Sequence, residues 1–231
     1  MRYALITICL IEIALARGTS AKTEQGAAAA RPIAESSGKT VEGRFWQWFA
    51  ANEKQLFTFE ANREVIFDEL AAQLRRVHSD LTFEFGPTDK NRREFIISAG
   101  GIQAAFPVVE SLFATAPNLP RWTFIKFRPR RHPVMTIQFG GKEVAPADVG
   151  CELDHEGAKI AITLYFEASV AADESVMKNI GYLLLDEALG EYDVETRVGT
   201  IEFRVGHPKH KIPNIQELAA EFDKFGSGRK R

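Results

Sequence analysis

The sequence feature that most constrains the fold is an alternating pattern between residues 149 and 205. Apolar side chains occupy every second position in two runs, which the turn His155-Glu156-Gly157 separates. Since successive side chains of a strand point to opposite faces, this period of two predicts a β-hairpin over a core. A four-residue apolar repeat then predicts a helix that ends at Gly190, and a last alternating run predicts a closing strand. The apolar positions are Val149, Cys151, Leu153, Ile160, Ile162, Leu164 and Phe166 in the hairpin, Val176, Ile180, Leu184 and Ala188 in the helix, and Ile201, Phe203 and Val205 in the strand.

The same order of hairpin, helix and strand is predicted a first time between residues 81 and 128. An alternating hairpin surrounds a turn-forming stretch at residues 87–92. Pro107 suits the first turn of the helix that follows, and residues 122–127 supply the closing strand. The two segments match poorly residue by residue. An internal duplication is therefore predicted from the order of elements and not from identity.

We predict an α+β fold with a largely antiparallel sheet built from two hairpin-helix-strand (ββαβ) units, N-terminal helices and a C-terminal helix. A dense aromatic cluster between Phe45 and Phe59 has helical spacing and is typical of a core. Gly140-Gly141 predicts a further small hairpin. Asn214 and Glu217 have the spacing of a capping box at the start of the last helix. The predicted core includes Phe83, Phe95, Leu112, Ile162, Leu164, Leu184, Ile201 and Phe203.

The chain ends are predicted to lie outside the folded part. Residues 1–21 have the positive start, apolar run and small residues of a signal peptide, although Glu12 interrupts the run. The run is shorter than the ~20 apolar residues of a spanning helix, so no transmembrane segment is expected in the mature chain. Residues 22–42 read as a disordered linker, 43–225 as a single α+β domain and 226–231 as a flexible basic tail. The sequence favours an exported protein, periplasmic or secreted, with a cytoplasmic protein as the alternative.

Charge is balanced over the whole chain but not along it. The 231 residues have a formal net charge of -2, which gives no general attraction to nucleic acid or membrane. Residues 121–131 hold five basic residues and no acid, whereas residues 142–195 hold three lysines against thirteen acids. The simplest interpretation is two oppositely charged faces that aid packing or solubility.

No catalytic or metal-binding constellation stands out. The two cysteines, Cys9 and Cys151, exclude a disulfide scaffold and a cysteine-based zinc site. Cys151 shares the apolar phase of its strand, which predicts a buried, unreactive thiol with a raised pKa. His207 and His210 have a loose metal-ligand spacing but no third partner at a recognised distance along the chain. We therefore expect no catalytic residues, no metal ligands and no cofactor.

The basic strand at residues 121–131 raises a nucleic-acid alternative. Alternation places Trp122, Phe124 and Lys126 on one face, and aromatic and cationic side chains on a sheet can bind single-stranded nucleic acid. No RNA-binding signature accompanies the strand. A face packed by helices, with basic residues exposed at its ends, is the preferred interpretation.

The leading functional hypothesis is a non-catalytic ligand-binding or protein-interaction module, whose partner is a small molecule or a protein. Its predicted ligand site lies where the two units meet, with Trp122 as an apolar wall, Arg128 as a donor and Glu191 as an acceptor. Alternatively, Arg128 and Glu191 pair or remain solvated at strand ends. A second hypothesis is a hydrolase whose carboxylates and histidines converge only in the fold. It requires a pocket that holds at least two of Glu152, Asp154, His155, Glu191, Asp193 and His207.

Four motifs resemble an uncharacterised bacterial family of small α+β proteins with a domain of unknown function. They are Phe45-Trp46-Gln47-Trp48-Phe49, Leu81-Thr82-Phe83-Glu84-Phe85, Pro120-Arg121-Trp122 and Gly190-Glu191-Tyr192-Asp193. The resemblance implies a fold over about residues 43–205 and no reaction. Its relatives look mostly cytoplasmic, and the extension before residue 43 departs from them.

Overall fold

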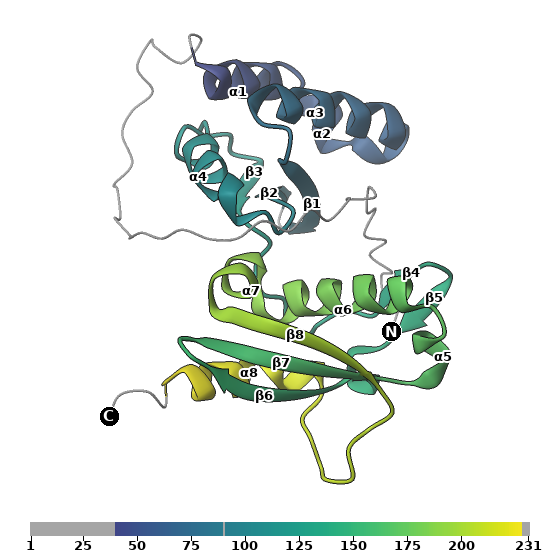
Figure 1. Ribbon diagram of the computed structural model, residues 1–231. Coiled ribbons are helices and arrows are strands. Elements are labelled where there is room, and N and C mark those ends of the chain that lie inside the picture. Colours follow the sequence, from purple (N-terminus) through teal and green to yellow (C-terminus); the bar gives the residue numbers. More distant parts are fainter. Residues whose placement is uncertain (1–39, 90, 228–231) are drawn as a thin grey trace. The chain divides into compact units, whose positions relative to one another are not determined.

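A computed structural model describes residues 40–89 and 91–227 and shows an α+β fold (Figure 1). The fold-class prediction is confirmed. The chain divides into two compact units, with the boundary between Lys126 and Phe127, and each unit is described by itself. The prediction of one domain over residues 43–225 stays a prediction. The predicted signal peptide, most of the linker and most of the basic tail lie outside the described residues.

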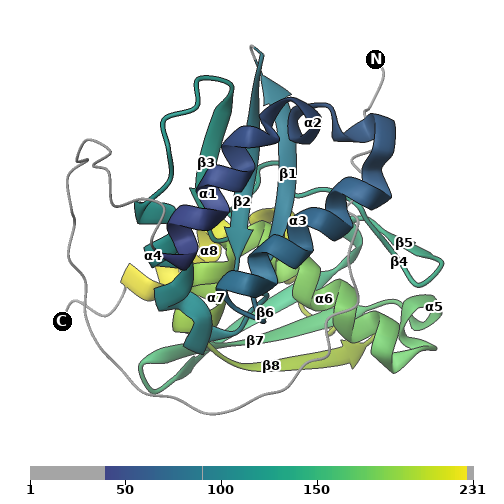
Figure 2. The ribbon, with the colours of Figure 1, turned by 90° about the horizontal axis from the view of Figure 1, so that it is seen from above.

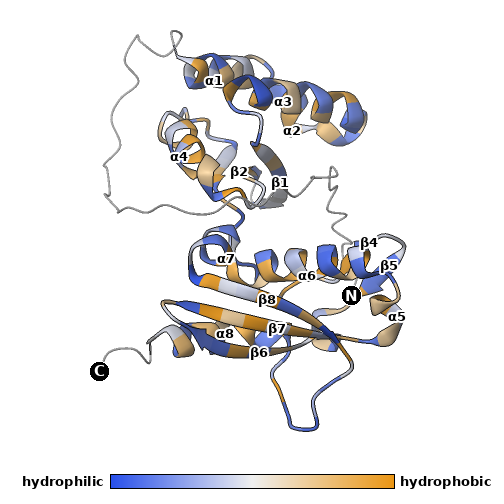
Figure 3. Cartoon of the chain, in the orientation of Figure 1, coloured by the Kyte–Doolittle hydropathy of each residue, from blue (hydrophilic) through white to orange (hydrophobic). Residues whose placement is uncertain are grey.

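The first unit begins with helices that carry the predicted aromatic cluster. Thr40 caps the first of them, since its Oγ1 accepts a hydrogen bond from the Gly43 N–H at 3.0 Å. The end of the predicted 22–42 linker is therefore part of a capped helix. Hydrophobic and hydrophilic stretches share the surface of these helices, as Figure 3 shows for α1 and α3. The elements are α1 (Val41–Ala51), α2 (Glu53–Phe57), η1 (Phe59–Asn62) and α3 (Arg63–Val77).

A three-stranded sheet follows in the order β1-β2-β3. Its first two strands are antiparallel, and the third runs parallel to the second. The predicted turn at residues 87–92 is shorter than expected because both strands extend into it. Asn91 takes the left-handed conformation there, with φ 62°, which asparagine tolerates well. The elements are β1 (Thr82–Asp89), β2 (Arg92–Ser98), η2 (Gln103–Ala105), α4 (Phe106–Ala114) and β3 (Trp122–Lys126).

Aromatic side chains form the core of this unit. Phe95 of β2 is fully buried, with its ring centroid 4.9 Å from that of Phe49. The Trp46 indole N–H donates to the Leu112 carbonyl at 2.8 Å, which ties α1 to α4. Figure 2 shows α1 and α3 crossing over the three strands. Of the predicted core residues here, Phe95 and Leu112 are fully buried and Phe83 is half-buried.

The second unit repeats the topology of the first. Its main sheet has the order β6-β7-β8, with β6 antiparallel and β8 parallel to β7. A separate hairpin, β4-β5, turns at Gly140-Gly141, both at positive φ. The strands among residues 40–89 and 91–227 thus form three sheets, so the expectation that both units join one sheet is wrong; the duplication stays a prediction. The elements are β4 (Ile137–Phe139), β5 (Lys142–Val144), η3 (Pro146–Asp148), β6 (Gly150–Glu156), β7 (Lys159–Phe166), α5 (Ala168–Ala171), α6 (Glu174–Leu189), α7 (Glu191–Arg197), β8 (Val198–Val205) and α8 (Ile215–Ser227).

Helices α6 and α8 cover one face of the β6-β7-β8 sheet. Cys151, Leu164 and Phe203 are aligned across the three strands on this face. Gly181 of α6 lies against Leu164 and Phe203, and Cys151 lies near Pro213, just before α8. The predicted capping box holds, because the Asn214 N–H donates to Glu217 at 3.1 Å. The predicted core residues Ile162, Leu164 and Leu184 are buried, and Ile201 and Phe203 are half-buried.

Candidate functional site

Arg128 and Glu191, two of the three predicted ligand-binding residues, lie side by side in the second unit. The Glu191 N–H donates to the Arg128 carbonyl at 2.9 Å, and the Glu191 carboxylate accepts the Arg128 N–H at 3.1 Å. The Arg128 guanidinium pairs with Asp186 at 3.2 Å. Glu191 is fully buried. The alternative that Glu191 remains solvated at a strand end is therefore wrong, because Glu191 begins helix α7 and its carboxylate satisfies a backbone donor.

Gly190 makes this approach of two chain segments possible. It ends α6 with φ 77° and ψ 147°, a conformation that side chains oppose. A Cβ at this position would lie 3.1 Å from the Arg128 carbonyl oxygen and 3.1 Å from the Arg130 nitrogen. Only glycine leaves room for the segment that passes here.

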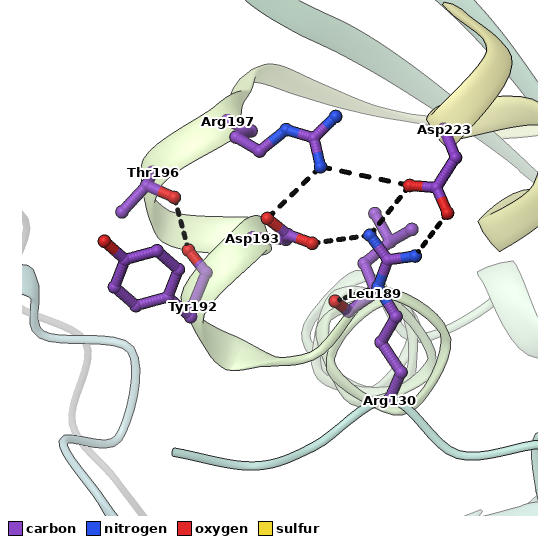
Figure 4. Close-up of polar contacts among 7 residues, drawn as sticks. All are labelled: Arg130, Leu189, Tyr192, Asp193, Thr196, Arg197 and Asp223. Carbon is purple, nitrogen blue, oxygen red and sulfur yellow. Dashed lines mark hydrogen bonds and ion pairs between the residues drawn. The ribbon is translucent and has the colours of Figure 1, made fainter. Parts of the chain in front are cut away.

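Asp193, another predicted acid, belongs to an ion-pair network around Arg130 (Figure 4). The Arg130 guanidinium donates to Asp193 at 2.5 Å, to Asp223 at 2.8 Å and to the Leu189 carbonyl at 2.9 Å. Arg197 pairs with Asp193 at 3.3 Å. The hydrogen bond from Arg130 holds the pKa of the Asp223 carboxyl below its usual range. These contacts link α6, α7 and α8, and they indicate a structural role for Asp193.

Trp122, the third predicted ligand-binding residue, belongs to the core of the first unit. It is 2% exposed, with its ring centroid 4.9 Å from that of Phe49 and 5.7 Å from that of Phe57. Phe124 similarly packs on Trp46 at 4.7 Å. The Trp122 ring is committed to the core and offers no free face for stacking a base, whereas Phe124 is half-buried. The ligand site formed by Trp122, Arg128 and Glu191 stays a prediction. Of its three residues, Arg128 and Glu191 are in contact.

The strongest candidate for a recognition surface is the other face of the β6-β7-β8 sheet. Glu152, Thr163 and Glu202 are aligned across its strands, and Tyr165 and Arg204 form the next aligned pair. Alternation along β6 adds Asp154 to the same face. Asp154, Glu202 and Arg204 are exposed. We call the residues Glu152, Asp154, Thr163, Tyr165, Glu202 and Arg204 the polar face.

A carboxylate-centred cluster occupies one end of the polar face. The Tyr165 hydroxyl donates a short hydrogen bond to Glu152, whose other oxygen lies 2.6 Å from His210 Nε2. The bond from Tyr165 lowers the pKa of Glu152, and the same bond raises the pKa of Tyr165. His207 and Ile212 lie against Gly150 at this end. The loop before α8 is thereby held on the sheet.

This cluster was not predicted from the sequence. Glu152 and Tyr165 share the polar phase of their strands, and this signal could have paired them. His210 is 58 residues from Glu152 and belongs to a loop without periodicity. Only the tertiary fold brings the histidine to the carboxylate.

A second candidate site lies in the first unit, where β2 and β3 begin. Parallel pairing sets Arg93 opposite Trp122, and the Arg93 N–H donates to the Arg121 carbonyl at 2.8 Å. The Arg121 guanidinium stacks over Phe57 at 3.5 Å, and that of Arg93 lies 4.6 Å from the Phe59 centroid. We call Arg92, Arg93, Arg121 and the two phenylalanines the arginine cluster.

Three buried donors of this region have no acceptor among the described residues. They are the Nε atoms of Arg93 and Arg121 and the indole nitrogen of Trp122. Leaving a buried donor unpaired costs about 1–3 kcal/mol. The three side chains share Phe57 as a neighbour, at 3.5 Å for Arg121, 5.5 Å for Arg93 and 5.7 Å for Trp122. Most buried donors in proteins are paired, and an acceptor bound beside this ring would explain the three unpaired ones.

Of the residues of the hydrolase hypothesis, Glu152 and His207 lie at the same end of the polar face, whereas Glu191 and Asp193 belong to α7. Glu152 and Asp154 belong to the polar face, whereas His155 stacks on Phe225 of α8 at 4.0 Å. Cys151 is buried, and burial raises its pKa to about 12, as predicted for an unreactive thiol. Among residues 40–89 and 91–227, no three His, Cys, Asp or Glu side chains are arranged to hold a metal ion.

Comparisons of the chain with family models, with curated proteins and with solved structures found no match. The resemblance to an uncharacterised bacterial family therefore stays a prediction. Within the part of the chain that the structure describes, no helix has the length and apolar character needed to span a membrane.

Proposed function

We propose that the protein is a non-catalytic interaction module, and that its polar face binds a protein partner through a basic segment. One observation carries the proposal. Helices α6 and α8 cover the Cys151 side of the β6-β7-β8 sheet, while charged side chains remain exposed on the other side. A sheet face of this kind offers fixed charges at regular spacing, which suits recognition.

The charge of the polar face supports a basic partner. By strand register the same face carries four carboxylates, Glu152, Asp154, Glu156 and Glu202, against two cations, Lys159 and Arg204. Glu202 pairs with Arg204 at 2.6 Å, whereas Asp154 has no ionic partner among the described residues. Complementary charge steers association and favours one class of partner over others.

The lowered pKa of Glu152 supports a role in binding a partner over a role in catalytic proton transfer. The hydrogen bond from Tyr165 lowers the pKa of this carboxyl, which makes it a weaker base. A catalytic base works best with a pKa near the working pH, so the shift has the opposite direction from the one a hydrolase needs. The buried ring of Trp122 likewise gives no support to single-stranded nucleic acid as the ligand.

A charge reversal tests this proposal. A lysine-rich peptide should bind the intact chain with saturable amide shifts at Asp154, Thr163 and Glu202 in a heteronuclear NMR titration. The substitution Asp154→Lys should weaken binding about tenfold, because it replaces an attraction by a repulsion. Glu69→Lys makes the same charge change on the exposed surface of α3 and serves as the control.

Two results would reject the polar face as the recognition surface. One is equal weakening by Asp154→Lys and Glu69→Lys, which would mean that only net charge matters. The other is tighter binding of an acidic peptide than of a basic one under the same salt conditions, since screening affects both alike.

We also propose that the protein is exported, on the basis of the apolar run from Ala4 to Ala16 behind a positive start. The intact mass of the protein purified from its native host tests this. Cleavage after Ala16 or Ala21 is the expected result. A cytosolic chain that retains Met1 would show that no signal peptide operates.

A further inference from the structure

We propose that the arginine cluster of the first unit binds the phosphate group of a small phosphorylated molecule. The proposal is independent of the polar face, because every residue that carries it precedes Phe127. It starts from the three unpaired donors, which belong to Arg93, Arg121 and Trp122. All are hydrogen-bond donors without acceptor capacity, so any ligand that binds them must supply acceptors.

The fold fixes these donors in one place. Since β2 and β3 run parallel, their first residues lie at the same end of the sheet. Arg92 donates to the Trp122 carbonyl at 2.8 Å, and Arg93 donates through its backbone to the Arg121 carbonyl at 2.8 Å. Strand pairing thus positions Arg92 and Arg93 directly, and the hydrogen bond from Arg93 holds the backbone of Arg121 in the turn before β3.

The rings beside the arginines hold the guanidinium groups in orientation. Phe57 lies 3.5 Å below the Arg121 guanidinium and 5.5 Å from that of Arg93. The Phe59 ring centroid lies 4.6 Å from the Arg93 guanidinium and 5.7 Å from that of Arg63. Stacking on a ring leaves the edge of a guanidinium free to donate in its own plane. Such pre-oriented forks match the oxygens of a phosphate.

The charge balance of the cluster leaves a cation available. Arg93 pairs with Glu60 at 2.5 Å, and this bond lowers the Glu60 pKa against the opposing effect of burial. Arg121 has no carboxylate partner among the described residues, and its guanidinium stacks on the Phe57 ring. It is half-buried, so an anion can reach it from solvent while the neighbouring donors lie deeper. Arg121 is therefore the residue on which affinity should depend most.

The indole N–H signal of Trp122 reports phosphate binding directly in an NMR titration. The chain has three tryptophans, and their indole N–H groups give three separate NMR signals. The Trp46 indole already donates to Leu112, whereas the Trp122 indole has no acceptor among the described residues. Titration of the full chain with inorganic phosphate should move the Trp122 signal saturably and leave that of Trp46 in place. A Trp122→Phe variant assigns the signal.

Matched variants separate a site from general attraction. Arg121→Gln should weaken phosphate binding at least tenfold, and Arg121→Lys should weaken it less, since a lysine keeps the charge but not the fork. Arg75→Gln removes the same charge from an exposed position of α3 and should leave the affinity unchanged. Circular dichroism should show that Arg121→Gln remains folded, because Arg121 makes no hydrogen bond through its side chain among the described residues.

Several outcomes would overturn the proposal. An unmoved Trp122 signal at saturating phosphate is one, and equal loss of affinity in Arg75→Gln and Arg121→Gln is another. Succinate and a short single-stranded RNA form two further arms of the titration. Succinate binding as tightly as phosphate would make the site a general anion site. Binding of the RNA without binding of inorganic phosphate would show that the ligand of the arginine cluster is a nucleic acid and not a small phosphorylated molecule.

Discussion

At the scale of single residues, Arg130 shows how one side chain can join several elements. Its guanidinium contacts Asp193, Asp223 and the end of α6 at Leu189. Bidentate pairs of arginine with carboxylate are stronger than isolated surface pairs because their geometry is fixed. The sequence gives no sign of this role, since Arg130 appears there only as one of five basic residues at 121–131.

The Arg130 network predicts a specific pH dependence of stability. Arg130 lowers the pKa of Asp223 in the folded chain. The resulting stabilisation is complete above the unfolded carboxyl pKa, about 4, and is lost as the pH falls through the lowered folded value. Arg130→Gln should therefore reduce the free energy of unfolding at pH 7 and reduce it less at pH 3, as measured by urea denaturation.

An exposed ion pair of α8, the helix that contains Asp223, provides the control for Arg130. Lys224→Gln breaks the pair with Glu221, in which the lysine is 70% exposed, and should change stability little at either pH. If Arg130→Gln lowered stability equally at pH 3 and pH 7, packing rather than charge would explain the effect. The carboxylates outside the network are common to both proteins and cancel in the comparison.

At the scale of elements, the regular periods made most of the fold predictable. Alternation gave both long hairpins, and the four-residue repeat gave the helix that the structure places at Glu174–Leu189. These signals are strong because each reflects burial of one face over many residues. The capping box at Asn214 was equally predictable from the sequence, since it depends on two side chains close in sequence.

Short elements and long-range polar contacts were not predictable. Helix α7 has seven residues, too few for a repeat, so the sequence predicts no helix there. Its carboxylate is buried because Gly190 lets the chain pass close to Arg128, a neighbour 63 residues away. The candidate sites likewise depend on contacts between residues that are far apart in the sequence. His210 reaches Glu152, and Arg121 reaches Phe57, only through the tertiary fold.

At the scale of the whole molecule, the repeated ββαβ topology gives each unit a sheet and a core of its own. The first core is aromatic, around Phe95, and the second is largely aliphatic, around Leu164. Charge follows the same division, with the arginine cluster in the first unit and the polar face in the second. Two surfaces of opposite charge thus belong to different compact units.

This division predicts that each unit can be destabilised by itself. All three tryptophans precede residue 127, so tryptophan fluorescence reports on the first unit. In a Cys9→Ser background, Cys151 is the only thiol, and its labelling reports on the second unit, where it is buried. Leu70 and Leu164 are both fully buried, one in each unit. Replacing either by alanine removes about 2–5 kcal/mol of stability from its core.

Urea unfolding followed by both probes should then give reciprocal shifts. With a slope of about 1–3 kcal/mol per molar urea, Leu164→Ala should lower the midpoint of thiol exposure by about 1 M or more and leave the fluorescence midpoint in place. Leu70→Ala should do the reverse. If each substitution moved both midpoints together, residues 43–225 would unfold as the single cooperative domain that the sequence suggests, because two-state unfolding requires coincident transitions from different probes.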